Sequence, residues 1–218
     1  MCGRTSIGVS KRVLENYYRA EMPGEFLPTY NAAPSRMLPI VRNVSPQLID
    51  LARWGFLPAW LKDKRPRGFI NTRAETALEK PSFRSAVVSR RCLVPADGFF
   101  EWDDRKQPYY FTLPRRSLFS LAGIWEMGAD RQGKGLITYS IMTTAADKTT
   151  AAIHGRMPVV LDRDTEKDWL RDSLTEADIK RLLLSPGGLE LIHYPVARLV
   201  NSSKADGEKL IRKLTTNG

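Results

Sequence analysis

The chain has 218 residues, 42% of them hydrophobic and 27% charged, and its 34 Lys and Arg residues against 24 Asp and Glu residues give a formal net charge of +10. This composition excludes an intrinsically disordered chain, and no apolar run is long enough to span a membrane. The positive excess indicates a polyanionic partner, most often nucleic acid, although evenly spread surface charge gives the same total.

The few cysteines and histidines exclude two further classes of protein, those built on disulfides and those built on a structural zinc site. Cys2, Cys92, His154 and His193 are the only residues of these two types. They are too few for a disulfide scaffold and lack the spacing of a structural zinc site. We therefore expect a reducing compartment, no metal and no other cofactor. The first residues contain no basic region followed by an apolar segment, which predicts a cytoplasmic protein without a membrane partner.

The first part of the chain mixes helix, loop and strand. Ser10 is a suitable N-cap for a helix over residues 10–21, where apolar residues recur at helical spacing. The stretch from 22 to 41 contains four prolines and is expected to be a loop that leads into a short strand at 38–42. The remaining predictions are a strand within 48–60 that ends in a proline turn, and two short helices over 71–80 and 81–91.

From residue 91 the pattern changes to short apolar, β-branched and aromatic runs typical of strands. These runs cover 91–104, 107–113, 118–127 and 136–146. Two short helices follow over 164–172 and 175–184, and a last strand region lies within 189–200. Strands in the middle with helices before and after predict a single α+β domain over 1–218 with a largely antiparallel sheet.

Cys2 raises the first chemical question, because it directly follows the initiator methionine in "MCGR". Removal of Met1 would leave an α-amine beside a thiol, and both groups are partly nucleophilic near neutral pH. With an aldehyde, the amine gives a Schiff base and the sulfur closes on it as a five-membered thiazolidine. The ring-opened sugar of an abasic DNA site is such an aldehyde in a polyanion. The alternatives are an idle cysteine and the N-terminal nucleophile of a glutamine amidotransferase.

Two residues are candidates for proton transfer. Strand alternation in "PADGFFEW" places Glu101 on the face of Phe99, where desolvation among aromatic neighbours would raise the pKa of its carboxyl. The alternative is a surface glutamate beside a simple Asp-Gly turn. His154 in "IHGRMP" lies at a loop or strand end, where a histidine can shuttle protons. His193 is interpreted as structural.

Other polar and aromatic residues fit a nucleic-acid site. Asn71 in "INTRAET" would by default cap a helix, but its amide is also able to orient an amine or a sugar oxygen. Arg4, Arg73 and Arg156 are candidates to grip phosphates. Trp60 in "WGFLPAW" is a candidate for stacking on an unpaired base, whereas Trp54 is expected in the core.

The ordered blocks "MCGR", "YNAAP", "RWGFLPAW", "INTRAET", "RCLVPADGFFEW", "KQPYYF" and "IHGRMPVVL" resemble those of the SRAP family, the SOS response-associated peptidase-like proteins that process abasic sites. The similarity runs from Cys2 to at least Leu161, with a weaker continuation at "PVARLVN". It implies a barrel-like β core flanked by short helices, and a basic groove for single-stranded DNA.

The resemblance also implies roles for individual residues. Cys2 would cross-link the abasic sugar after Met1 removal, Asn71 would orient the terminus, Glu101 would assist sugar opening and Schiff-base chemistry, and His154 would transfer protons. Arg4 and Arg73 would hold phosphates next to the lesion, Asn31 would shape the pocket, and Trp60 would pack on flanking DNA. Where many relatives carry an acidic or larger residue this chain has Gly155, which we expect to loosen the loop of His154.

Three functions therefore remain open at the level of sequence. The main hypothesis is covalent capture of abasic sites in single-stranded DNA by a monomeric protein of the cytoplasm that is nucleoid-associated when bound to DNA. Lyase or autoproteolytic peptidase activity could accompany it. The others are an amidotransferase or peptidase that uses Cys2, and a DNA-binding module without covalent chemistry.

Overall fold

The core of the protein is a closed barrel of five strands. In the computed structural model, which describes residues 2–59, 68–116, 118–129, 132, 135–184 and 189–214, the ring runs from β10 through β4, β3, β6 and β9 back to β10. Among the neighbouring strands of this ring, only β10 and β4 run parallel, and the other four pairs are antiparallel. The largely antiparallel core is therefore confirmed. The barrel strands are β3 (Met37–Arg42), β4 (Ile49–Trp54), β6 (Arg91–Ala96), β9 (Phe119–Ala129) and β10 (Gly135–Ala145).

Short strands extend the barrel sheet at the far end of β10. β5 (Asn71–Arg73) pairs parallel with β10, and β11 (Arg156–Pro158) pairs antiparallel with it. β12 (Val160–Leu161) lies beside β9. Thr143 of β10 is opposite both Arg73 and Pro158, so one stretch of β10 holds β5 and β11 on its two edges. This pairing brings two segments that lie far apart in the sequence to the same end of the barrel.

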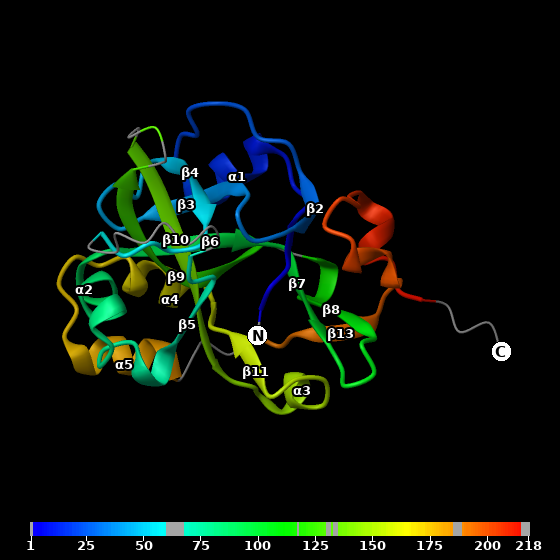
Figure 1. Cartoon of the computed structure of the whole chain (residues 1–218). Coiled ribbons are helices and arrows are strands. Elements are labelled where there is room, and N and C mark those ends of the chain that lie inside the picture. The colour runs from blue at the N-terminus through cyan, green and yellow to red at the C-terminus, as the bar shows by residue number, and fades with distance from the viewer. Residues whose placement is uncertain are drawn as a thin grey trace.

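A second, antiparallel sheet lies against the barrel, to the right in Figure 1. Its order is β13, β8, β7, β1, β2. These strands are β1 (Thr5–Ile7), β2 (Thr29–Ala32), β7 (Gly98–Trp102), β8 (Pro108–Thr112) and β13 (Ile192–Pro195). His193 on β13 stacks on Phe111 at 5.1 Å between ring centroids, which agrees with a structural role. The N-terminal segment enters between the barrel and this sheet (Figure 1).

Asp97 holds the N-terminal strand in place. Its carboxylate accepts hydrogen bonds from the Ser6 hydroxyl at 2.5 Å and from the Gly8 backbone N–H at 2.9 Å. A Cβ on the next residue, Gly98, would lie 2.2 Å from the Tyr110 ring, so only glycine allows this packing. The Asp-Gly pair is therefore not a simple hairpin turn, because the chain passes there from the barrel strand β6 to the second sheet.

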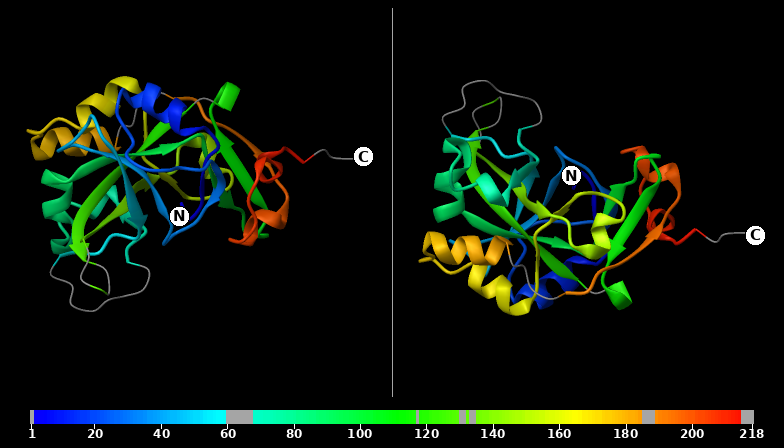
Figure 2. Two further views of the ribbon diagram at one scale, coloured as in Figure 1. Left: turned by 90° about the horizontal axis from the view of Figure 1, so that it is seen from above. Right: turned by 90° about the horizontal axis from the view of Figure 1, so that it is seen from below.

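Helices cover the barrel where the sequence predicts them, with one exception. α1 and α4 lie side by side in both views of Figure 2, and α2 and α5 cover a neighbouring side. The α-helices are α1 (Lys11–Tyr18), α2 (Pro81–Ser89), α3 (Lys148–Ala151), α4 (Arg163–Trp169) and α5 (Glu176–Leu184). The 3₁₀ helices are η1 (Ala74–Thr76), η2 (Pro114–Arg116), η3 (Arg198–Asn201) and η4 (Glu208–Ile211). Within the described ranges, no helix has the length and apolar character needed to cross a membrane.

The helix expected over 71–80 is wrong. Residues 71–73 form the strand β5 and only 74–76 are helical, as the single 3₁₀ turn η1. The physical reason is the edge of β10 at residues 141–143, whose buried backbone groups need hydrogen-bond partners and pair with residues 71–73; this pairing outweighs the weak helix preference of 71–73. Trp54 is confirmed in the core: it is 0% exposed and its indole N–H donates to the Ile70 carbonyl at 2.9 Å.

Candidate functional site

Cys2 lies three residues before the start of β1 and is fully buried. Its backbone carbonyl accepts a hydrogen bond of 2.8 Å from the Asn71 side-chain amide. Burial raises the pKa of its thiol strongly, and the negative charge of Glu101 raises that pKa further. In the chain that still carries Met1, the thiol is therefore held protonated next to Glu101.

Asn71 joins the N-terminal segment to the barrel from its position on β5. Its Nδ2 donates to Cys2, while its Oδ1 is buried and accepts no hydrogen bond from any residue that the structure describes. A buried acceptor that receives no hydrogen bond costs folding free energy, so such an atom often marks a place where a further group binds. Asn71 does not cap a helix here, because Arg73 is the residue that precedes η1.

Glu101 and His154, the two candidates for proton transfer, lie next to each other. Glu101 on β7 is 2% exposed, and burial raises the pKa of its carboxyl. His154 Nδ1 lies 3.9 Å from Glu101 Oε2, and the His154 side chain is 33% exposed. The expected alternation is present, because Phe99 packs in the main core with Cys2 whereas Phe100 packs in a separate cluster. The buried carboxyl thus meets an imidazole that solvent can reach.

The loop of His154 is held through Arg156. The Arg156 backbone N–H donates to His154 Nδ1 at 3.1 Å, and the Arg156 guanidinium forms two bonds to the Glu75 carboxylate, of 2.6 and 3.0 Å. Arg156 also donates to the Thr143 carbonyl at 2.8 Å. Its guanidinium is thus engaged with the protein. Glu75 was missed by the sequence analysis, although it stands in "INTRAET".

Arg4 and Asn31 contact the C-terminal part of the chain. Arg4 Nη1 donates to Asn31 Oδ1 at 2.6 Å and to the Val200 carbonyl at 2.9 Å. The Asn31 amide, which is 0% exposed, donates to the carbonyls of Ser202 and Ala205 at 2.9 and 2.7 Å. Both side chains therefore hold the backbone of residues 200–205 in place. Their roles toward DNA stay predictions.

The remaining candidates differ in their surroundings. Arg73, at the end of β5, is exposed and forms no ion pair with any described residue. It is thus a cation that is open to a phosphate. Gly155 is exposed, and a Cβ there would meet no atom within 4 Å, so the loop does not require glycine for lack of space. Trp60 lies outside the described residues.

Fold and geometry together define a class of protein: a small α+β barrel in which a cysteine beside the initiator methionine lies among an amide, a buried carboxyl and an imidazole. The family model for SOS response associated peptidase (SRAP) matches residues 1–203. The chain belongs to the SRAP family, which confirms the resemblance seen in the sequence.

Several relatives cover nearly the whole chain. The abasic site processing protein YoqW of Bacillus subtilis is 38% identical over 221 residues, covering 97% of this chain and 99% of that protein. The abasic site processing protein YoaM of the same organism is 40% identical over 195 residues, covering 86% of each chain. The chicken (Gallus gallus) abasic site processing protein HMCES is 30% identical and covers 94% of this chain and 76% of its own length.

Solved structures agree with the fold. A crystal structure of a protein from Bacteroides thetaiotaomicron superimposes with a TM-score of 0.88 at 27% identity, covering 98% of this chain and 100% of that one. A second, from Bordetella bronchiseptica, gives a TM-score of 0.77 at 24% identity and covers 90% of this chain and 100% of that one. The α+β barrel fold is thus shared with solved structures.

Proposed function

We propose that this protein captures abasic sites in single-stranded DNA covalently, through Cys2 after removal of Met1, as a monomer of the cytoplasm that joins the nucleoid when bound. The observation that carries the proposal is the hydrogen bond from Asn71 Nδ2 to the Cys2 carbonyl, together with the buried Asn71 Oδ1, which accepts no hydrogen bond from a described residue. An α-amine freed at Cys2 would supply a donor to that oxygen. The substrate is supported by relatives that are named abasic site processing proteins.

The reaction divides into two steps. The Cys2 amine attacks the aldehyde carbon of the opened sugar, and loss of water gives a Schiff base. The thiol then adds across the carbon–nitrogen double bond: sulfur bonds to carbon, its proton passes to nitrogen, and the five-membered thiazolidine closes. No oxidant, metal or cofactor takes part in this balance. The amine and thiol of one residue make the second step intramolecular.

Glu101 and His154 would manage the protons of these steps. Because burial raises the pKa of the Glu101 carboxyl, it is suited to give a proton to the sugar ring oxygen during opening. His154, partly exposed and 3.9 Å from Glu101, is placed to exchange that proton with solvent. The same pair could remove a proton from the Schiff base, and β-elimination would then be a side reaction when thiol closure is slow.

Met1 removal would act as the step that activates Cys2. With Met1 attached, the Cys2 nitrogen belongs to a peptide bond and is not a nucleophile, and the raised thiol pKa keeps sulfur protonated. Cleavage of this single bond would free the amine. A peptidase activity of the protein toward its own Met1–Cys2 bond would perform the same cleavage.

The test is intact mass spectrometry before and after incubation with an abasic oligonucleotide. We expect loss of methionine in the starting protein and a heat-stable adduct whose mass is that of protein plus DNA minus one water. Cys2→Ala should give no adduct, whereas Cys92→Ala, which removes the other buried cysteine, should retain it. One residue inserted between Met1 and Cys2 should abolish the adduct and leave DNA binding.

Other outcomes identify the rival functions. An adduct that survives in Cys2→Ala would exclude the proposed chemistry. Cleaved DNA with an imine that only borohydride traps would indicate a lyase. Ammonia release from glutamine would indicate an amidotransferase, and equal binding of intact and abasic DNA without an adduct would indicate a non-covalent binding module.

A further inference from the structure

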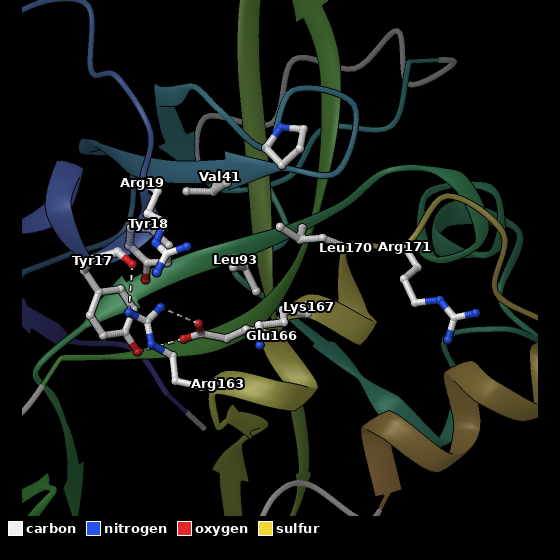
Figure 3. Close-up of a pocket in the computed structure, with 11 residues that line it drawn as sticks. Tyr17, Tyr18, Arg19, Val41, Leu93, Arg163, Glu166, Lys167, Leu170 and Arg171 are labelled. Carbon is white, nitrogen blue, oxygen red and sulfur yellow. Dashed lines mark hydrogen bonds and ion pairs between the residues drawn. The ribbon is translucent and has the colours of Figure 1, made fainter.

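A pocket of about 550 Å³ lies between α1 and α4 (Figure 3). Its apolar floor is formed by Val41 on β3 and Leu93 on β6, which are paired neighbours in the barrel, and Leu170 after α4 adds a wall. In both views of Figure 2, α1 and α4 lie on the side of the barrel away from the N-terminal end of the chain. This pocket is therefore separate from the Cys2 site, and its volume is in the range of ligand-binding cavities.

One end of the pocket is closed by three polar side chains that satisfy one another. The Tyr17 hydroxyl donates to Glu166 Oε1 at 2.9 Å, and Arg163 Nη1 donates to Glu166 Oε2 at 3.1 Å (Figure 3). The Arg163 guanidinium also lies over the Tyr17 ring, 3.4 Å from its centroid. Because Arg163 neutralises Glu166, this end adds no net charge, and the tyrosine face is covered.

The rest of the rim is cationic. Arg19, Lys167 and Arg171 line the pocket, and Arg19 forms no ion pair with any residue in the described part of the chain. Lys167 pairs with Asp164 at 3.4 Å within α4, and Arg171, two residues after the end of α4, pairs with Asp168 at 3.7 Å. Exposed pairs of this kind are weak and exchange readily with another anion. An apolar floor below a positive rim favours a ligand with an apolar body and a negative charge.

We propose that this pocket docks a short acidic peptide segment of a partner protein, anchored by a large apolar side chain. The apolar side chain would pack against the half-buried Leu170, above the buried floor of Val41 and Leu93, and neighbouring carboxylates would meet Arg19, Lys167 and Arg171. Charge complementarity would give such a partner its orientation and speed of association.

A DNA strand fits this pocket less well than an acidic peptide does. Unpaired bases bind by stacking on aromatic faces, and the Tyr17 face is already covered by Arg163. Lys167 and Arg171 each have an acidic neighbour, Asp164 and Asp168, so Arg19 is the cation of this rim that has no ion partner in the described part of the chain. Such a rim offers little to a continuous chain of phosphates, whereas one or two carboxylates beside an apolar side chain need only one or two cations.

The position of the pocket would let a peptide and a nucleic acid bind to different parts of the protein. Because α1 and α4 lie on the side of the barrel away from the N-terminal end of the chain, a peptide in this pocket would leave the N-terminal end open to a nucleic acid. The inference does not depend on the proposed function, since none of its residues belongs to the Cys2 site. Peptide docking in this pocket would let the protein, while bound to DNA, recruit a partner protein to the same place.

The experiment measures the anisotropy of a fluorescein-labelled peptide, Gly-Asp-Leu-Phe-Asp-Asp, titrated with the full-length protein. A second peptide has serine in place of Leu and Phe, and labelled oligothymidine is the nucleic-acid probe. We expect the first peptide to bind, and the double variant Arg19→Glu/Lys167→Glu to weaken it about tenfold or more. Leu170→Ser should also weaken it without a change of charge.

The matched control is Lys180→Glu/Lys209→Glu, which makes the same change in net charge at exposed residues that do not line the pocket. It should leave peptide binding within about twofold of the unaltered protein. Thermal unfolding of each variant verifies that it folds. Equal binding of the serine peptide, equal loss in both double variants, or no peptide binding at millimolar protein would overturn the proposal. Loss of oligothymidine binding alone would assign the pocket to DNA instead.

Discussion

At the scale of single residues, Glu101 combines a cost to stability with the role in proton transfer that we propose for it. Its carboxyl is 2% exposed, and burial raises its pKa above the ordinary value of 4.5. Between these two pKa values the folded protein binds more protons than the unfolded chain. Glu101 therefore lowers the free energy of unfolding as pH rises through this window, and the whole cost is present above it.

Glu101→Gln should separate the two effects. The amide keeps the shape but carries no charge, so at pH 7 we expect the free energy of unfolding to rise by about 1 kcal/mol, and the gain to vanish at pH 4. The rate of adduct formation should fall about a hundredfold or more, because proton transfer is lost. Urea unfolding at both pH values and single-turnover cross-linking measure these changes. A variant that is less stable at pH 7 would contradict the electrostatic argument.

Gly155 gives a second prediction at this scale. Since a Cβ there meets no atom within 4 Å, Gly155→Ala should be accommodated. It should stabilise the fold by about 0.4–1 kcal/mol by restricting the unfolded chain. Differential scanning calorimetry measures the gain, and cross-linking should proceed at the rate of the unaltered protein. A slower rate would mean that freedom of the His154 loop is required.

At the scale of elements, Arg91 ties two helices to the barrel. This side chain on β6 is 0% exposed, and burial lowers the pKa of its guanidinium. It donates to the Trp169 carbonyl at 2.9 Å and the Val87 carbonyl at 3.1 Å, and also to the carbonyls of Val88 and Arg171. These carbonyls stand at the C-terminal ends of α2 and α4, where a cation is favoured by the helix dipole.

Arg91→Met should fill much of the same space but leave the carbonyls without donors. We expect a loss of about 3 kcal/mol or more in the free energy of unfolding. Because α4 is one wall of the acidic-peptide pocket, peptide affinity should fall as well. Urea unfolding followed by tryptophan fluorescence measures the first effect. Arg42→Met, at a residue whose guanidinium pairs with Asp50 at 2.6 Å, is the control and should cost less, since that pair is partly exposed.

At the scale of the whole molecule, the charge of +10 predicts that DNA binding weakens as salt rises. Arg73→Ala should lower the slope of log K against log salt by about 0.7, because one phosphate contact to a single strand is lost. Arg12→Ala removes an exposed cation on α1, away from the N-terminal end, and should leave the slope unchanged. Equal slopes for both variants would mean that Arg73 does not contact the strand.

Local sequence patterns predicted most helices and strands, because the spacing of apolar residues that favours each of them can be seen within a short stretch of the chain. The helices at α1, α2, α4 and α5 and the long strands of the barrel follow from apolar spacing. β1, β2, β11 and β12 are two to four residues long and have no pattern of their own. Their formation depends on a strand edge that another part of the chain provides, as β10 does for β5 and β11.

For the site, the sequence by itself determined which reactive groups are present: a cysteine behind the initiator methionine, one glutamate in an aromatic strand, one loop histidine and an excess of cations. Only the tertiary structure decided how these groups act on one another. It joined Asn71 to the Cys2 carbonyl, paired Arg156 with Glu75, buried Asn31 and formed a pocket between α1 and α4. Side-chain type is a local property, whereas burial and partnership arise when distant segments pack together.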